Sequence, residues 1–348
     1  MIPLLVTTGV SLALLLATPD AAWAWGPPTH AFIGSRILEN LAVLPVLVRE
    51  LLKAYPWQYL YGNLAADIAL GQRYVPYTRH CHNWEVGFTI LDHSETPPQQ
   101  AFALGYLSHL AADTIAHNVF VPRQLAATPH ATRLGHTYWE YRFDSETGDE
   151  FLRLAREIVT SDHEEADALL ERVITQAFFS FQTNKRIYQQ IIHLSNRERW
   201  NTLWVRMADR SRWDLPSERV DGLSRLSIAY VEDLLRLGAE SLSQRLDPTG
   251  SERLALAKKL RRQSFRTARR EVGRELTAAP LSSISMEDAA RLVKTRPIPP
   301  EEMEMLAAIF FPDPAWPARS AEGNGLDVEG QTDFWAAFSG ARPVSAAS

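Results

Sequence analysis

The segment that most constrains the fold of this chain runs from Phe102 to Pro122 and is apolar on nearly every side of a helical wheel. A helix of this kind belongs in the interior of a protein. His109, Asp113 and His117 interrupt it at a spacing of four residues, which places their side chains on one helical face. Buried polar groups of this kind must be paired. Either a divalent metal or hydrogen bonds between two core histidines and one aspartate would pair them.

The rest of the chain has the apolar spacing of helices. Apolar residues recur at intervals of three and four from Ser35 onward, without sustained alternation of period two. The pattern predicts an all-α multi-helix bundle with a helical C-terminal extension. Ser161 followed by Glu164 is a capping-box pattern and predicts a helix start near residue 163. The helices are expected near residues 31–54, 59–70, 83–93, 98–120, 134–142, 147–159, 163–181, 184–208, 218–242 and 250–274.

Composition excludes several classes of protein. The chain has 348 residues, of which 46% are hydrophobic, with 17 Gly and 21 Pro, so collagen-like and disordered chains are excluded. A formal net charge of −5 gives no global sign of a protein that coats nucleic acid. The single cysteine, Cys81, excludes an intramolecular disulfide framework.

Residues 1–24 have the pattern of a secretory signal peptide. An apolar run from Ile2 to Ala17 is followed by small residues that end at Ala24, as at a signal-peptidase site. The run lacks a preceding Lys or Arg, so an uncleaved anchor is the alternative. Cleavage after Ala24 would make Trp25 the first residue of a secreted or periplasmic protein.

Further candidate metal ligands lie outside the apolar helix. They are Asp67 in an apolar stretch, His80 and His82 on either side of Cys81, and the pair His136 and Glu140. Zinc accepts imidazole, carboxylate and thiolate ligands. The four-residue spacing of His136 and Glu140 also occurs in solvated helix contacts, and Cys81 is also compatible with an inert buried thiol.

The order of these residues resembles the ligand set of the zinc-dependent phospholipase C family, which is related to the zinc nucleases of single-stranded nucleic acids. The resemblance covers residues 25–145. It implies a mainly helical bundle with a cleft that holds three zinc ions, one of them bound by the amino nitrogen and carbonyl oxygen of an N-terminal tryptophan. The matching residues are Trp25, His30, Asp67, His82, His109, Asp113, His117, His136 and Glu140.

The resemblance also distributes these ligands over the zinc ions. It assigns the first zinc to Asp67, His82, His109 and Asp113, the second to His117, His136 and Glu140, and the third to Trp25, His30 and Asp113. Asp113 would therefore bridge two zinc ions, and Asp67 would also orient the attacking water, so both are candidate catalytic residues. His80 stays an alternative to His82. The step from Asp113 to His117 is shorter than the family usually has.

Together with the signal-peptide pattern, the resemblance implies an exported phospholipase C that releases diacylglycerol and a phosphorylated headgroup, or a related phosphodiesterase with another phosphodiester substrate. Glu140 is typical of the bacterial phospholipases, whereas the short gap from Trp25 to His30 is typical of the nucleases. A single-strand-specific zinc nuclease and a non-catalytic secreted zinc protein are therefore the alternatives. Pro28 and Ile68 stand where well-known phospholipases of the family carry residues that recognise choline, so phosphatidylcholine is not an implied substrate.

The C-terminal half has weaker signals. Residues 146–295 are expected to add helices to the same or a closely packed domain, and 296–348 to form a loop-rich tail. Residues 252–274 carry nine Lys/Arg against two Glu around an apolar stripe. Such a basic amphipathic helix predicts contact with an anionic membrane surface or with nucleic-acid phosphates, and the solvated face of a packed helix is the alternative.

Overall fold

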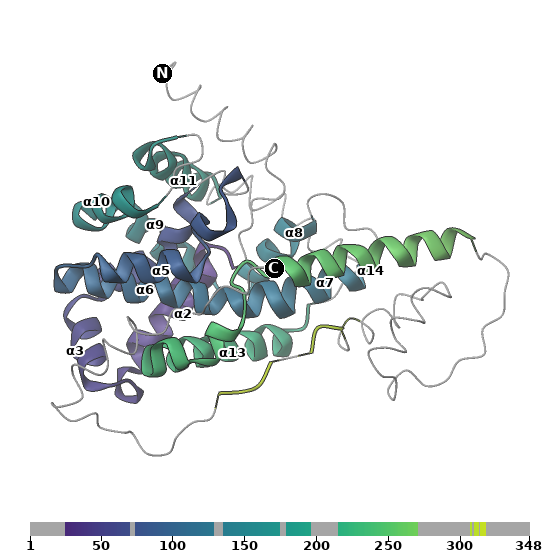
Figure 1. The fold of residues 1–348 in the computed structure, drawn as a ribbon, viewed down its shortest axis with the longest axis horizontal. Coiled ribbons are helices and arrows are strands. Elements are labelled where there is room, and N and C mark those ends of the chain that lie inside the picture. Colours follow the sequence, from purple (N-terminus) through teal and green to yellow (C-terminus); the bar gives the residue numbers. More distant parts are fainter. Residues whose placement is uncertain are drawn as a thin grey trace.

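The computed structural model describes residues 25–69, 74–128, 135–174, 179–195, 215–270, 307, 310–312 and 314–317. Within these ranges the chain forms helices and turns and no strand, which confirms the predicted all-α class (Figure 1). The proposed signal peptide, residues 1–24, lies outside the described residues. No helix in the described ranges is long and apolar enough to cross a membrane.

Helix α6 (Pro97–Ile115) is the centre of the bundle. It starts with a capping box, in which the Thr96 hydroxyl accepts from the Gln99 N–H and the Gln99 side chain accepts from the Thr96 N–H. Every residue from Ala101 to Ile115 is buried. The chain continues directly into a π-helix, η5 (Ala116–Phe120), and then into α7 (Val121–Ala127). The expectation of a buried central helix is therefore confirmed.

Helix α4 (Pro56–Ala65) crosses α6 in backbone contact. A Cβ atom on Gly62 would lie 2.1 Å from the carbonyl oxygen of Phe102, and one on Gly105 would lie 2.1 Å from that of Tyr59. The two glycines thus allow the helices to approach more closely than side chains would permit. The short 3-10 helix η2 (Ala66–Ile68), which follows α4, is thereby held beside α6.

The other helices surround this pair. Helices α13 and α2 pack on α6, α9 packs on α2 and α4, and α14 runs along α7 and extends beyond it (Figure 1). Their bounds are α2 (Pro27–Glu39), α3 (Val46–Ala54), α5 (Trp84–Asp92), α8 (Gly135–Asp144), α9 (Asp149–Thr160), α10 (Glu164–Val173), α11 (Phe181–Ser195), α13 (Ser217–Leu237) and α14 (Ser251–Arg270). The remaining 3-10 helices are η1 (Leu41–Val43), η4 (Tyr77–Arg79), η6 (Gly238–Glu240) and η7 (Leu242–Arg245).

Two local predictions were wrong. The helix expected over 31–54 is interrupted: α2 ends at Glu39, the 3-10 helix η1 follows, and Pro45 keeps Leu44 in an extended conformation before α3 begins. The capping box at Ser161 does not form, because the Ser161 hydroxyl donates instead to the Glu157 carbonyl of α9 at 2.7 Å. Helix α10 nevertheless begins at the expected place, at Glu164. Residues 196–208 of the expected helix 184–208 lie outside the described residues.

A short piece of the expected C-terminal tail docks on the bundle. Arg123 of α7 donates to the carbonyl of Phe311 at 2.6 Å, and Arg253 of α14 donates to that of Phe310 at 3.0 Å. Tyr230 of α13 donates to the carbonyl of Ala315 at 3.0 Å, and the Phe311 side chain is buried. These contacts connect Phe310, Phe311 and Ala315 with three helices.

Candidate metal centre

Helix α6 brings His109 and Asp113 into the buried centre of the protein, where His30 of α2 joins them. Nε2 of His30 lies 3.2 Å from Oδ1 of Asp113, and Nε2 of His109 lies 3.3 Å from Oδ2. The two imidazole rings stack with centroids 3.8 Å apart. All three side chains have no exposed surface. One ligand atom from each lies within 4.8 Å of the others, a distance that suits a shared metal ion.

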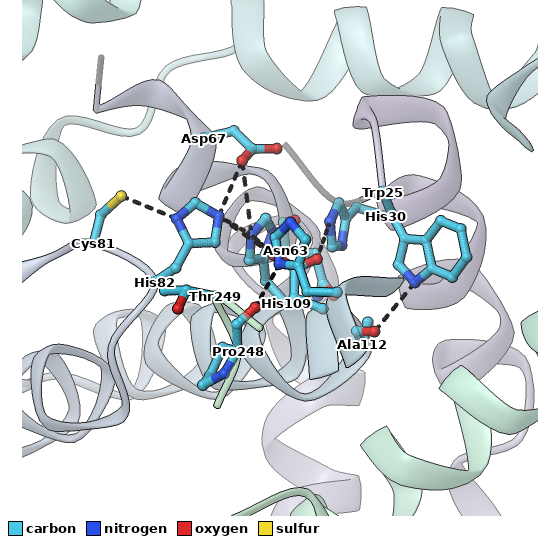
Figure 2. A network of polar contacts seen from close by, with 12 residues as sticks. Trp25, His30, Asn63, Asp67, Cys81, His82, His109, Ala112, Pro248 and Thr249 are labelled. Carbon is cyan, nitrogen blue, oxygen red and sulfur yellow. Dashed lines mark hydrogen bonds and ion pairs between the residues drawn. The ribbon is translucent and has the colours of Figure 1, made fainter. Parts of the chain in front are cut away.

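His82 lies against the other oxygen of Asp113, and Asp67 of η2 lies beside His82. Nε2 of His82 lies 3.2 Å from Oδ1 of Asp67, 3.3 Å from Oδ2 of Asp113 and 3.0 Å from Nε2 of His109 (Figure 2). Asp67, His82 and His109 thus form a second group of converging ligand atoms. The two groups share His109, and the Asp113 carboxylate connects them, because its Oδ1 faces His30 while its Oδ2 faces His82 and His109.

A further group comprises His117, His136 and Glu140. Nε2 of His136 lies 2.7 Å from Oε1 of Glu140 on α8, and the His117 ring meets the His136 ring edge-on with centroids 5.5 Å apart. All three residues are buried. His117 lies within the π-helix, where the helical phase changes, so it groups with α8 and not with His109 and Asp113. The expectation of one shared face therefore holds for His109 and Asp113 of α6 but not for His117 of η5.

Trp25, the first described residue, is fully buried against the end of α6. Its indole Nε1 donates to the carbonyl of Ala112 at 3.1 Å. Its ring packs on Phe120 and Phe143, with centroid distances of 5.2 and 4.0 Å. The indole anchors the start of the described chain beside the residue that precedes Asp113, as Figure 2 shows.

The geometry distinguishes His82 from His80. The His82 ring lies between Cys81 and Asp67, with Nδ1 3.1 Å from the Cys81 sulfur and Nε2 directed at the Asp67 group (Figure 2). His80 is half-buried, and its Nδ1 accepts from the backbone N–H of His82 at 3.0 Å. In the groups of possible metal ligands among the described residues, His80 occurs only with Cys81 and His82.

A family model for zinc-dependent phospholipase C matches residues 29–202. The chain belongs to the zinc-dependent phospholipase C family. The resemblance inferred from the ligand order is thus confirmed, and the match extends well beyond residue 145, where the resemblance was expected to end. Neither the curated proteins nor the solved structures contain a significant match to the chain.

The buried groups of this phospholipase C family member fit zinc. Among the described residues, both carboxylate oxygens of Asp67 and Asp113 and Nε2 of His30 and His117 have no hydrogen-bond partner. Carboxylate oxygens and unprotonated imidazole nitrogens are acceptors, and the convergence of several such acceptors in a buried centre favours a divalent cation. The donor set of nitrogen and carboxylate oxygen is one that zinc prefers.

The electrostatics of the Asp113 groups also favour a cation. Burial raises the pKa of Asp67 to about 6, against the opposing effect of His109. Burial acts in the same direction on Asp113, but His109 and His30 outweigh it and hold the pKa of Asp113 well below its usual range. Burial lowers the pKa of His82 to about 3, which leaves it neutral at pH 7. Burial also opposes the charge on His109, yet Asp113 and Asp67 raise its pKa to about 9, so zinc binding there would release a proton.

In the third group, burial favours the uncharged forms of His136 and Glu140. Burial lowers the pKa of His136 well below its usual value, and His117 and the Lys258 ammonium of α14 lower it further. Burial raises the pKa of Glu140 well above its usual value, with Asp144 contributing in the same direction. His136 is therefore a neutral imidazole, the form that binds zinc, and a metal ion would ionise Glu140 on binding.

Several residues that support the centre were not found by sequence reasoning. The carbonyl of Asn63 accepts from Nδ1 of His109 at 2.8 Å, and that of Pro248 accepts from Nδ1 of His117 at 2.5 Å. Backbone carbonyls carry no residue-specific signal, so these contacts require the fold. Asp144 did have a signal, because it follows His136 and Glu140 at the same spacing of four on α8.

Asp144 holds the segment that follows Trp25. Its Oδ1 accepts from the Gly26 N–H at 3.1 Å and from the Thr29 hydroxyl at 2.6 Å. A Cβ atom on Gly26 would lie 1.8 Å from the other carboxylate oxygen. The start of α2, and with it the main chain of Trp25, is therefore fixed to α8.

Proposed function

We propose that this chain is an exported zinc-dependent phospholipase C, which hydrolyses a phospholipid to diacylglycerol and a phosphorylated headgroup. The observation that carries the proposal is the Asp113 carboxylate, whose Oδ1 faces His30 while its Oδ2 faces His82 and His109. A carboxylate in this position can join two metal ions, as in two-metal phosphodiesterase chemistry. Export would follow from removal of residues 1–24, with the secreted or periplasmic protein beginning at Trp25.

The proposed centre holds three zinc ions. His82 supplies Nε2 in preference to His80, because its ring is directed at Asp67 while Nδ1 faces Cys81. The amino nitrogen and carbonyl oxygen of Trp25 would complete the site of His30. The proposed ligands are Asp67, His82, His109 and Asp113 for one ion, Trp25, His30 and Asp113 for another, and His117, His136 and Glu140 for the third.

The residues of the chain have distinct tasks in the proposed hydrolysis. When bound, zinc supplies Lewis-acid stabilisation of the phosphodiester oxygens and lowers the pKa of water. Asp67 orients the attacking water and accepts its proton, a role that suits a buried carboxylate whose pKa is raised toward neutrality. Asp113 holds the two ligand groups at a fixed separation. The burial of all these side chains excludes bulk water and strengthens their electrostatic interactions.

The substrate is proposed as a phospholipid without a commitment to choline. Pro28 and Ile68 are apolar and buried, so neither offers charge to a headgroup. The proposed contact of residues 252–274 with an anionic membrane surface is electrostatic, because Leu254, Ala257 and Leu260 on the apolar side of α14 are buried. The contact should therefore weaken as salt is added.

The test is parallel hydrolysis by zinc-loaded protein that begins at Trp25. Mixed phospholipid vesicles and single-stranded DNA are offered separately, and diacylglycerol and nucleotides are quantified. The proposal expects diacylglycerol release that disappears in Asp113→Asn. Nucleotide release without lipid cleavage would favour the nuclease alternative, and no product from either would leave a different phosphodiester substrate or a non-catalytic zinc protein.

A further inference from the structure

A loop from the C-terminal part of the chain contacts His117 in the third ligand group. Nδ1 of His117 lies 2.5 Å from the carbonyl oxygen of Pro248, which is 131 residues further along the chain. A carbonyl oxygen only accepts, so Nδ1 must carry a proton, and Nε2 is then the nitrogen that can bind a metal ion. This Nε2 is buried and lies in the group with His136 and Glu140.

The loop that presents Pro248 is rigidly built. The Asp247 side chain accepts from the Thr249 N–H and hydroxyl at 2.9 and 2.6 Å, and from the Ser251 N–H and hydroxyl at 3.2 and 2.9 Å. These hydrogen bonds outweigh the effect of burial and lower the pKa of Asp247, so its carboxylate stays ionised. The Tyr77 hydroxyl adds a further bond to it at 3.0 Å. The loop is thus organised around a single carboxylate.

Two more contacts attach the loop to the bundle beside His117. Asn118 donates its side-chain amide to the carbonyl of Asp247 at 2.8 Å, and Trp84 donates Nε1 to that of Leu246 at 2.9 Å. The three carbonyls that accept from α5 and η5 are therefore consecutive, at Leu246, Asp247 and Pro248. The loop therefore packs against the π-helix η5 at His117 and Asn118.

Gly250 allows the loop to lie directly on His117. Its φ is +54°, in the region that favours glycine, and a Cβ atom there would lie 2.3 Å from the carbonyl oxygen and 2.6 Å from the Cβ of His117. Any side chain at this position would displace either the loop or the histidine. The close approach therefore requires glycine at residue 250.

We propose that the loop Leu246–Ser251 is a positioning element of the metal centre. The Pro248 carbonyl fixes the tautomer and orientation of His117, so that Nε2 faces the ion shared with His136 and Glu140. The loop lies beyond residue 202, where the family match ends, so this chain uses its C-terminal part to complete a site of the matched region. The inference rests on the proposed function for the assignment of that ion.

The first test compares zinc retention in two glycine variants of the full chain that begins at Trp25. Gly250→Ala should displace the loop, whereas Gly148→Ala places a similar strain at a positive φ, +104°, near only the flexible side chain of Glu150. Zinc per chain is measured against a graded series of chelator, with His136→Ala as the reference for loss of the third ion. We expect Gly250→Ala to weaken binding of the zinc ion that His136→Ala loses. The expected loss of affinity is about 10- to 100-fold, the range seen when a group that supports a ligand is lost.

The outcomes separate this inference from the proposed function. Equal zinc retention in both glycine variants, with loss in His136→Ala, would overturn the positioning role and leave the zinc assignment standing. Unchanged zinc in His136→Ala would overturn both.

A second test needs no variant of the loop. The zinc-free chain is labelled with ¹⁵N-histidine, and the ring tautomers are read from long-range ¹H–¹⁵N correlations, with His117→Gln identifying the signal of His117. The proposal expects the tautomer of His117 that carries its proton on Nδ1. A proton on Nε2, or an even mixture of tautomers, would overturn it.

Discussion

Oδ1 of Asp113 lies 3.2 Å from Nε2 of His30, although the two residues come from different helices, α6 and α2. The second oxygen of the same carboxylate faces His82 and His109. The His30 contact therefore connects the N-terminal helix with the central helix through one carboxylate. The separation of the two ligand groups, and the proposed function with it, depends on this carboxylate.

Replacing Asp113 by Asn should impair two zinc sites at once. An amide offers one oxygen and no charge, so it cannot satisfy both groups. We expect zinc per chain to fall by about two equivalents and hydrolysis to fall by more than about 100-fold, the upper end of the loss found for groups that only support a ligand. Atomic emission and a diacylglycerol assay measure the two effects. Asp221→Asn on the exposed side of α13 is the control and should change neither. Unaltered zinc content in Asp113→Asn would refute the bridging role.

Extra residues before Trp25 should weaken binding of the zinc ion assigned to His30. Such an extension converts the amino group of Trp25 into an amide, which is a poor zinc ligand. We expect a chain with two added residues to keep its fold but to retain one zinc fewer than the chain that begins at Trp25. Trp25→Phe, with its amino group free, is the control: it loses the bond to Ala112 but should keep the zinc. Three tightly bound zinc ions in the extended chain would contradict the Trp25 assignment.

Asp144 should make the zinc-free protein less stable as the pH rises from about 4 to about 7. Burial raises the pKa of Asp144 to about 7, although hydrogen bonds from Thr29 and Gly26 oppose this. Over this range the unfolded chain releases a proton that the folded chain keeps, so the free energy of unfolding falls. Below pH 4 the carboxyl group is protonated in both states and has no effect.

Asp144→Asn removes this titration while an amide oxygen remains as acceptor. We expect the free energy of unfolding of the wild type, relative to the variant, to fall by at most about 1.4 kcal/mol per pH unit. Urea unfolding of the zinc-free proteins at several pH values measures the difference. Parallel curves between pH 4 and 7 would show that Asp144 is ionised throughout.

The buried ion pair between Asp167 and Lys185 should stabilise the fold without affecting zinc. Nζ of Lys185 lies 2.6 Å from Oδ2 of Asp167, whose other oxygen accepts from the Tyr61 hydroxyl at 2.5 Å. This network joins α4, α10 and α11. Lys185→Met leaves a buried carboxylate uncompensated, so we expect a loss of about 3–5 kcal/mol in the free energy of unfolding.

The double variant Asp167→Asn with Lys185→Met is the matched control for this pair. It removes both charges and should recover part of the stability lost in Lys185→Met. Urea unfolding measures both variants, and zinc content should stay that of the wild type. A Lys185→Met protein as stable as the wild type would mean that the pair contributes nothing.

The sequence predicted the central helix and most of the centre because their signals are local. Three polar residues in an apolar segment indicated burial and pairing, and the order of the candidate ligands indicated the family. His117 differs from the prediction only in its helical face, because the π-helix that turns it toward His136 leaves no pattern in the spacing; its grouping with His136 and Glu140 is the one that the family resemblance implied. The break between α2 and α3 had a local signal in Pro45, but the apolar periodicity on both sides obscured it.

The contacts that support the ligands could not be predicted in the same way. Pro248 acts through its carbonyl oxygen, and every residue type carries one, so only the folded chain identifies the partner of His117. Ser161 has the sequence of a capping box, but the box does not form in the fold. Its hydroxyl donates instead to the nearer Glu157 carbonyl. Asp144 could have been predicted from the sequence, because it follows His136 and Glu140 on α8 at the same spacing of four residues.

Anomalous diffraction at the zinc edge, from crystals of the chain that begins at Trp25, tests most directly whether Asp113 bridges two of three zinc ions. We expect three anomalous peaks, with one oxygen of Asp113 bound to each of two ions and the third ion held by His117, His136 and Glu140. A single ion, or two ions with Asp113 bound to only one of them, would contradict it.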